Sequence, residues 1–337
     1  MTDPIHRSYP VADRSYVSII KRDVRALAQT LGFAASRLGE LDIIIAELTS
    51  NLVKYAQDGE LLVRAIPGTI HAGIELISVD SGPGMVDSAR MMMDGVSTGG
   101  SLGQGLGAVN RLADLFQLYS LPGRCTVGLV RVYVEPPKQP PKNPSATVRA
   151  LLVSKADQTP CGDGFYCKLT ITSLRLFLGD GLGHGLPAHQ AVAAATRTMV
   201  LQRENSPAAW LTAIHRAAIG TRGLVGTAAV FDFATRKWTV CGVGNIRTQL
   251  CGGSYQKSYA AQNGIIGYNM PRMLLEQQLP YEPGQLLVMA SDGIQTRWNP
   301  ARYPTISRYD PMVLAAAIYK EHGRRTDDMS VVVARIH

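Results

Sequence analysis

The sequence predicts an α+β protein made of two α/β sandwich domains joined by a linker. Its 337 residues exceed the size of one ordinary domain. The stretch EPPKQPPKNPS, at 135–145, has no apolar periodicity and is typical of an extended spacer. Helical and strand-like apolar patterns occur on both sides of it. We therefore predict a first domain over residues 1–134, a linker over 135–146 and a second domain over 147–337.

Composition narrows the class of protein. Hydrophobic residues make up 46% of the chain and charged residues 18%, which is typical of globular proteins. The N-terminal MTDPIHRSYPVADR lacks the apolar core of a signal peptide, and no apolar run is long enough to span a membrane. The five cysteines form no CxxC pair, which favours reduced thiols and a cytoplasmic protein. The net charge of +8 is scattered, which argues against direct nucleic-acid binding and suits an acidic or phosphorylated partner.

Two helices, two strands and a third helix are expected in the first domain. They are predicted at 15–31, 38–55, 60–66, 73–79 and 108–116. On the second helix Glu47 and Asn51 are four residues apart and share one face. A carboxylate and a carboxamide presented together can polarise a water and ligate Mg²⁺. The alternative is that both side chains simply face solvent.

Two glycine-containing turns follow this helix. The second strand runs into Asp80-Ser81-Gly82-Pro83-Gly84-Met85, where a flat ring could lie against the backbone and be fixed by one carboxylate. The later run from Ser97 to Gly107 precedes a helix, whose N-terminal N–H groups can bind phosphate. This run is neither a P-loop nor a dinucleotide fingerprint. Together the pieces indicate a nucleotide site.

These motifs resemble the N, G1 and G2 boxes of the GHKL (Bergerat) ATP-binding fold, in Glu47–Asn51, Asp80–Gly84 and Gly103–Gly107. The first domain is most similar to the serine kinases and anti-sigma factors of bacterial stress signalling, including the stressosome switch kinase. No phospho-acceptor histidine helix precedes it, which argues against a sensor histidine kinase. The resemblance implies ATP with Mg²⁺, Glu47 as the general base, Asn51 as the Mg²⁺ ligand and Asp80 as the adenine contact. The nucleotide-binding and lid glycines would be Gly82, Gly84, Gly99, Gly100, Gly103, Gly105 and Gly107.

The second domain alternates short strands with helix pairs, which suggests an α/β sandwich rather than a doubly wound sheet. Strands are predicted at 148–153, 167–172, 174–178, 226–233, 238–242 and 285–290. Helices are predicted at 187–202, 207–219 and 311–322.

A further strand is predicted at 329–333, and acidic residues lie at or near strand ends, most of them beside glycine. They are Asp163, Asp180, Asp292, Asp327 and Asp328. Converging carboxylates repel each other unless cations hold them, and hard oxygen ligands select Mg²⁺ or Mn²⁺. For any single aspartate a turn or cap is the commoner explanation. For the whole set, we predict a metal site.

The pattern resembles the SpoIIE-like branch of the PPM metal-dependent Ser/Thr phosphatases, which have an αββα sandwich. The stretch Gly179–Gly185, with the sequence GDGLGHG, is similar to the stressosome feedback phosphatase in particular. The resemblance implies two Mn²⁺ or Mg²⁺ ions held by Asp163, Asp180, the Gly181 carbonyl, Asp292 and Asp327, with Asp327 preferred over Asp328. Asp180 and Asp292 would be central to catalysis. The arginine that grips phosphate in eukaryotic members has no assignable counterpart.

Both resemblances together predict a bifunctional regulator of a partner-switching or stressosome-like pathway. One domain would phosphorylate protein serines and the other would remove such phosphates. Partners would be STAS-domain anti-sigma antagonists or stressosome scaffolds; a sigma factor and a homodimer are left open. Alternatively, the first domain is an anti-sigma factor or ATP-sensing module without kinase activity, or the second domain is an inactive scaffold.

Overall fold

The computed structural model describes residues 5–13, 15–68, 71–85, 105–137, 144–156, 158–252 and 255–337. The chain forms two compact groups of residues. The first unit comprises Met1–Lys142 together with Arg308–Glu321, and the second unit comprises Asn143–Ser307 with His322–His337. The division at residue 142 falls within the predicted linker, whereas the sequence assigned 308–321 to the second domain. The predicted domain limits remain a prediction, and we describe each unit by itself.

The first unit is built on one antiparallel sheet of five strands. Their order is β1-β2-β3-β5-β4. The strands are β1 (Arg7–Pro10), β2 (Glu60–Ile66), β3 (Gly73–Asp80), β4 (Leu115–Leu121) and β5 (Cys125–Tyr133). The central strands β3 and β5 are buried almost throughout.

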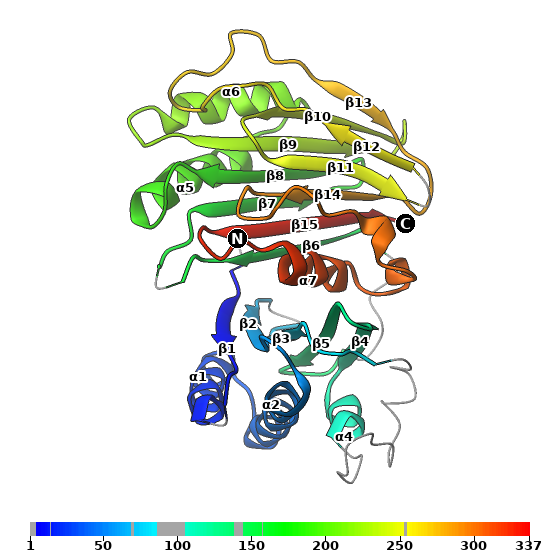
Figure 1. Cartoon of the computed structure of the whole chain (residues 1–337). Helices are drawn as coiled ribbons and strands as arrows, with labels where there is room; N and C mark the ends of the chain where they lie inside the picture. The colour runs from blue at the N-terminus through cyan, green and yellow to red at the C-terminus, as the bar shows by residue number, and fades with distance from the viewer. Residues whose placement is uncertain are drawn as a thin grey trace. The chain divides into compact units, whose positions relative to one another are not determined.

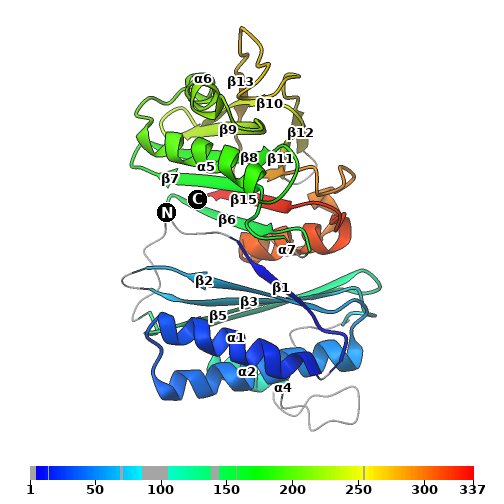
Figure 2. The same ribbon diagram turned by 90° about the vertical axis from the view of Figure 1, so that its left-hand side faces the viewer.

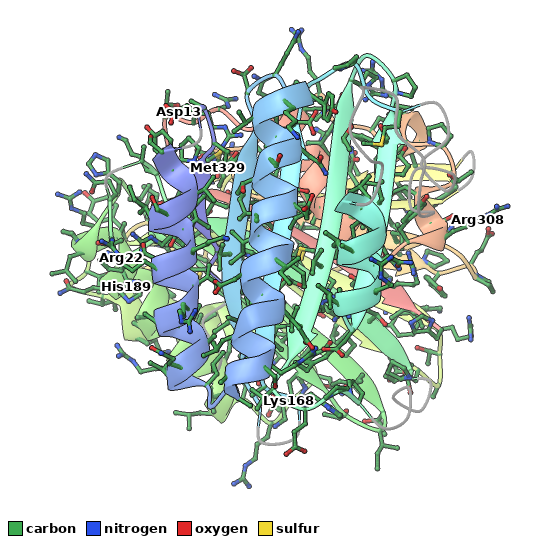
Figure 3. The ribbon with its side chains drawn as sticks, turned by 90° about the horizontal axis from the view of Figure 1, so that it is seen from below. Asp13, Arg22, Lys168, His189, Arg308 and Met329 are labelled. Carbon is green, nitrogen blue, oxygen red and sulfur yellow. The ribbon has the colours of Figure 1, made fainter. Side chains whose placement is uncertain are left out.

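Three helices cover one face of this sheet: α1 (Ser15–Thr30), α2 (Ala35–Tyr55) and α4 (Gly105–Leu112). Figures 2 and 3 show them side by side on that face. Helix α1 buries Ile20, Val24 and Ala28, which recur at the four-residue spacing of one helical face. Helix α2 contributes a longer apolar stripe, and both stripes join β2, β3 and β5 in one core. The fold is therefore an α/β sandwich.

The second unit contains two antiparallel sheets of five strands each. Their orders are β13-β10-β9-β8-β7 and β12-β11-β14-β15-β6. The first sheet contains β7 (Asp163–Leu169), β8 (Ser173–Gly181), β9 (Leu224–Asp232), β10 (Lys237–Val243) and β13 (Gln277–Pro280). The second contains β6 (Ala146–Val153), β11 (Arg247–Gly252), β12 (Tyr255–Tyr259), β14 (Leu286–Ala290) and β15 (Met329–Ile336).

The two sheets face each other across a packed interior. The Tyr259 hydroxyl on β12 accepts a hydrogen bond of 2.8 Å from the Gly242 N–H on β10. A Cβ at Gly242 would collide with the Thr227 hydroxyl on β9. Helices α5 (Leu186–Leu201) and α6 (Pro207–Ala218) pack on the sheet that holds β8 and β9, as Figure 1 shows. Two short 3₁₀ turns, η1 (Pro300–Arg302) and η2 (Ile306–Arg308), follow β14.

These observations confirm the predicted fold class, and two element predictions are wrong in detail. The helix predicted at 108–116 is α4, which begins three residues earlier and ends at Leu112, because Leu115 and the residues after it pair with β5. The strand predicted at 167–172 is β7, which begins at Asp163 in register with β8. Within the described ranges, no helix has both the length and the apolar character needed to cross a bilayer.

Candidate functional site

The predicted metal ligands gather where several strand ends of the second unit meet. Asp163, the first residue of β7, pairs directly with Asp180 near the end of β8. The next strand positions Val225 opposite Asp180 on its other side. Antiparallel neighbours that face each other have Cβ atoms about 5 Å apart, so β pairing alone brings two carboxylates together.

Asp163 is fully enclosed and only partly satisfied. Its Oδ2 accepts hydrogen bonds from the Ser291 hydroxyl at 2.8 Å and the Ser330 hydroxyl at 2.6 Å. Its Oδ1 is buried without a hydrogen-bond partner. Burial raises the pKa of Asp163 above its ordinary value, although the two hydroxyls lower it. A buried carboxylate oxygen without a hydrogen-bond partner is a candidate ligand for a cation.

Asp180 shares this acidic environment. Burial raises the pKa of its carboxyl, and the negative charges of Asp163, Asp292 and Asp327 raise it further. Asp180 therefore lies near enough to each of the other three carboxylates to be repelled by it. Asp292 follows β14 and is oriented by Asn245, whose Nδ2 donates to Asp292 Oδ2 at 2.9 Å. Asn245 follows Gly244 directly after β10.

The two consecutive aspartates before β15 have different surroundings. Asp328 accepts backbone N–H groups with both oxygens, from Lys155 to Oδ1 and from Gly162 to Oδ2, each at 2.8 Å. It is 3% exposed and ties the β6–β7 connection to β15. Asp327 is more exposed, and its Oδ1 accepts the Asp328 N–H at 2.9 Å. These contacts suit a ligand role for Asp327 and a structural role for Asp328.

Two glycines keep the backbone close at this edge. A Cβ on Gly181 would collide with the Ala188 carbonyl at the start of α5, and one on Gly293 would collide with the Asp328 carbonyl. The Gly181 N–H also donates to the Gly162 carbonyl at 3.0 Å. The turns after β8 and β14 therefore tolerate no side chain at these positions.

The donor set fits hard divalent cations by its chemistry. It offers several carboxylates, one of them with an orphaned buried oxygen, and their mutual repulsion would be relieved by positive charge. Among the residues that the structure describes, no group of three or more His, Cys, Asp or Glu side chains is placed so that it could hold a metal ion without rearrangement. The predicted ligands therefore remain a prediction.

Sequence reasoning missed a cation at this edge. Arg222 precedes β9, and a Cβ on Gly183 would lie 2.8 Å from its Nη1. The Leu182 N–H donates to the Gly223 carbonyl at 3.1 Å, which fixes the turn after Asp180 beside Arg222. His184, in the same turn, contacts Gln158 through Nδ1 at 3.3 Å. Gly183 and Arg222 lie about 40 positions apart in the sequence, and the pairing of β8 with β9 brings them together. No local sequence pattern could therefore have identified Arg222.

The first unit places the other predicted site on α2 and α4. Glu47 and Asn51 lie one turn apart on α2, and both are partly exposed. A Cβ on Gly105, the first residue of α4, would collide with Glu47 Oε2. The Glu47 carboxylate thus lies directly against the N-terminus of α4, where backbone N–H groups are unpaired.

Asp80 ends β3 and shapes the neighbouring turn. Its Oδ1 accepts the Gly82 N–H at 2.8 Å, and burial raises its pKa. Gly84 adopts φ +74° against Pro122, so a glycine is needed there. Gly107 lies buried in α4. The predicted lid glycines Gly99, Gly100 and Gly103 lie outside the described residues.

Comparisons with known proteins identify a different family in each half of the chain. A family model described as histidine kinase-like ATPase domain matches residues 11–130, and one described as Stage II sporulation protein E matches residues 172–337. The serine/threonine-protein kinase RsbT of Bacillus subtilis is 37% identical over 102 residues, which cover 30% of this chain and 77% of RsbT. The phosphoserine phosphatase RsbX of the same organism is 26% identical over 144 residues, covering 42% of this chain and 71% of RsbX.

Solved structures give the same result. One solved chain is described as "The bacterial stressosome: a modular system that has been adapted to control secondary messenger signaling". It superposes with a TM-score of 0.54 and 31% sequence identity, and the match covers 56% of this chain and 99% of the solved chain. RsbX in complex with magnesium shares the fold, with a TM-score of 0.52 and 20% identity over 59% of this chain and 99% of RsbX. The chain belongs to the histidine kinase-like ATPase family through its N-terminal part and to the SpoIIE family of PPM phosphatases through its C-terminal part.

Proposed function

We propose that this chain is a bifunctional regulator that phosphorylates serines on partner proteins and hydrolyses phosphoserine or phosphothreonine. The observation that supports the proposal is the direct cross-strand pair of Asp163 and Asp180, in which the buried Oδ1 of Asp163 has no hydrogen-bond partner. The membership in a phosphatase family and the relation to a serine kinase supply the two activities.

In the phosphatase reaction, the residues of this edge would hold two Mn²⁺ or Mg²⁺ ions. Such ions, when bound, orient the phosphate and lower the pKa of the attacking water. Asp163, Asp180, the Gly181 carbonyl, Asp292 and Asp327 are the ligands we propose. The Ser291 and Ser330 hydroxyls fix the rotamer of Asp163, and Asn245 fixes that of Asp292. Arg222 adds positive charge for the substrate phosphate.

In the kinase reaction, ATP with Mg²⁺ would bind between α2, the Asp80 turn and the start of α4. Glu47 would accept the proton of the attacking serine, and Asn51 would hold Mg²⁺. Asp80, Gly82, Gly84 and the glycines from Gly99 to Gly107 would contact the nucleotide. The proposed substrates are STAS-domain anti-sigma antagonists or stressosome scaffold proteins, since the relatives carry stressosome and Rsb names.

Two matched pairs of assays test the two activities. For the kinase, the chain is incubated with labelled ATP, Mg²⁺ and a STAS-domain protein, beside Glu47→Ala. Equal transfer by both chains would refute the kinase activity and leave an ATP-sensing or anti-sigma role. For the phosphatase, Mn²⁺-dependent hydrolysis of p-nitrophenyl phosphate is compared with Asp292→Asn. Equal rates would refute the proposed catalytic edge.

Arg222 has its own test in the phosphatase assay. Arg222→Ala should raise KM for a phosphopeptide about tenfold while kcat changes less, because a surface cation that binds phosphate acts mainly in substrate binding. Arg203→Ala, an exposed arginine of the same unit after α5, is the control. An unchanged KM in Arg222→Ala would remove this residue from the proposed mechanism.

A further inference from the structure

Helix α7 (Pro311–His322) comes from the C-terminal half of the sequence, yet the segment Arg308–Glu321 belongs to the first unit. All nine residues from Pro311 to Tyr319 are buried. A helix that is apolar all round has to be covered on every face. The segment is therefore buried along most of its length rather than exposed at the surface.

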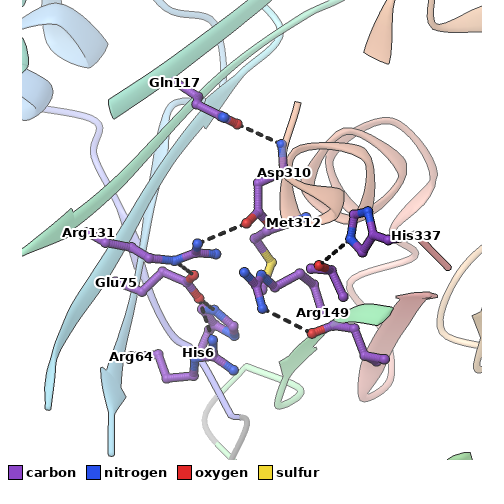
Figure 4. A network of polar contacts seen from close by, with 11 residues as sticks. His6, Arg64, Glu75, Gln117, Arg131, Arg149, Asp310, Met312 and His337 are labelled. Atoms are coloured by element: carbon purple, nitrogen blue, oxygen red, sulfur yellow. Dashed lines mark hydrogen bonds and ion pairs between the residues drawn. The ribbon is translucent and has the colours of Figure 1, made fainter. Parts of the chain in front are cut away.

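The start of α7 is fixed to the sheet of the first unit by Asp310. Its Oδ1 caps the helix by accepting the Met312 N–H at 2.9 Å. Its Oδ2 accepts Arg131 Nη1 at 2.9 Å, and its N–H donates to Gln117 Oε1 at 2.7 Å (Figure 4). One residue thus caps the helix and joins it to both β4 and β5.

Arg131 is itself part of a buried ionic cluster on the sheet. Its Nε donates to Glu75 Oε2 at 2.7 Å, and Arg64 donates to Glu75 Oε1 at 2.6 Å. His6 also contacts that oxygen at 3.1 Å, and Glu75 has no exposed surface. A buried ionic cluster has a sharply defined geometry, because its charges tolerate little misalignment. The helix start therefore rests on a rigid base.

The end of α7 is held close to the predicted nucleotide turn. The Tyr319 hydroxyl donates to Glu60 Oε1 at 2.6 Å. Glu321 receives two parallel hydrogen bonds from Arg124, at 2.8 and 2.7 Å. Arg124 lies in the β4–β5 turn, where the neighbouring Gly123 N–H donates to the Pro83 carbonyl at 3.0 Å. The Asp80–Gly84 turn is thus two contacts away from Glu321.

The next residues along the chain lead into the acidic edge of the second unit. The His322 carbonyl accepts the Gln295 N–H at 2.8 Å, and the Arg324 N–H donates to the Gly293 carbonyl at 2.8 Å. Residues 293–295 directly follow Asp292. Two residues after Arg325, which adopts φ +62°, comes Asp327. This short connection is therefore bonded to the loop that carries one proposed ligand and ends in another.

We propose that α7 is a tether through which occupancy of the nucleotide site changes the phosphatase activity. Glu321, clamped by Arg124, and His322, bonded to the 293–295 loop, are consecutive residues, so a shift of one moves the other. When nucleotide binds and rearranges the Asp80–Gly84 turn, the ion pair between Arg124 and Glu321 switches between a formed and an open state. The helix carries that change to Asp292 and Asp327. The proposal rests on the proposed function of both sites.

The test uses the full chain, p-nitrophenyl phosphate, Mn²⁺ in excess and a non-hydrolysable ATP analogue. In the wild type, saturating analogue should change kcat/KM at least fivefold, the lower end of usual allosteric couplings. In Arg124→Ala, the ratio of kcat/KM with the analogue to kcat/KM without it should lie within about 1.5-fold of unity, because the clamp is lost. The activity of this variant without nucleotide should stay within about twofold of the wild type, because the acidic edge is intact. Arg124→Glu combined with Glu321→Arg should recover at least about half of the coupling.

A control variant and a second readout separate coupling from general damage. Arg25→Ala removes the exposed Arg25–Asp42 pair of the same unit and should keep the full coupling. Hydrogen exchange in the wild type should change on adding the analogue at residues 293–295 and 322–328 but not in β10 and β11. In Arg124→Ala this change should disappear.

The outcomes distinguish the tether from the proposed function. If the analogue binds, measured by calorimetry, and phosphate is hydrolysed, yet the activity and the exchange at 322–328 do not change, the tether is wrong and the two activities stand. If the analogue does not bind, the nucleotide part of the proposed function fails and the tether fails with it. If Arg124→Ala binds the analogue and keeps wild-type coupling, the clamp is not the route and the proposal is overturned.

Discussion

Replacing Glu75 by glutamine should destabilise the first unit selectively. Glu75 is fully buried between Arg131, Arg64 and His6. Breaking a buried ion pair by removing one partner costs about 3–5 kcal/mol, because the other charge is left buried. The lower end applies here because Arg131 keeps its bond to Asp310 and Arg64 is 17% exposed. We therefore expect a loss of about 3 kcal/mol in the free energy of unfolding of this unit.

The three tryptophans make this prediction measurable. Trp210, Trp238 and Trp298 all belong to the second unit, so tryptophan emission reports that unit, whereas far-ultraviolet circular dichroism reports both. With a urea slope of about 2 kcal/mol per M, the first-unit midpoint should fall by about 1.5 M in Glu75→Gln. The emission midpoint should move by less than about a third of that. Asp42→Asn, which removes an exposed pair worth about 0–1 kcal/mol, is the matched control.

The pH dependence of this difference has a fixed sign. Burial alone would raise the pKa of Glu75, but the positive charges of Arg131 and Arg64 outweigh it and hold the pKa well below its ordinary value. A group whose folded-state pKa is depressed stabilises the fold above its unfolded-state pKa and loses that contribution as pH falls through the folded-state value. The gap between wild type and Glu75→Gln should therefore be largest near neutral pH and close in acid. An equal shift in both signals, or no shift in either, would refute the reasoning.

Three further predictions concern the second unit. Gly293→Ala should remove phosphatase activity and lower the melting temperature, since the new Cβ meets the Asp328 carbonyl; wild-type activity in p-nitrophenyl phosphate assays would contradict this. Asp328→Asn should cost about 1–3 kcal/mol in the free energy of unfolding, because one of its two backbone donors then faces an amide N–H₂ group; an unchanged urea midpoint of tryptophan emission would count against it. Tyr259→Phe should cost about 1–2 kcal/mol by the same measurement, because the buried Gly242 N–H loses its acceptor, and retention of the wild-type midpoint would show that water or a shift replaces the hydroxyl.

Strong local patterns made much of the fold predictable. The stripe of α2 and the strand at 60–66 follow from apolar periodicity, and the structure places them at nearly the same residues. Prediction was weaker where pairing decides the structure. Leu115–Leu121 continues the apolar character of α4, and its pairing with β5 makes it a strand. Strands β1, β5, β11, β12 and β13 were also not predicted. The last three are short and mix polar residues with apolar ones.

The residues of the candidate site likewise fall into those that local patterns identify and those that only strand pairing reveals. Asp163 and Asp180 were identified from glycine-flanked strand ends, and their direct cross-strand pairing accounts for their approach. Arg222 could not be identified, because its neighbour Gly183 is brought close by strand register alone. Distinguishing Asp327 from Asp328 likewise required knowing which backbone N–H groups each carboxylate accepts.

The origin of α7 in residues 311–322 bears on how the protein can be dissected. A fragment cut at the proline-rich segment, ending at residue 142, would lack α7 and the residue before it, Asp310, which pairs with the buried Arg131. Arg131 would lose Asp310, and Glu60 would lose Tyr319. Such a fragment should be less stable than the first unit of the intact chain, because buried polar groups lose their partners. Although the two halves resemble separate proteins, the segment Arg308–Glu321, encoded near the C-terminal end, groups with the first unit, so a cut at the proline-rich segment does not separate the two units cleanly.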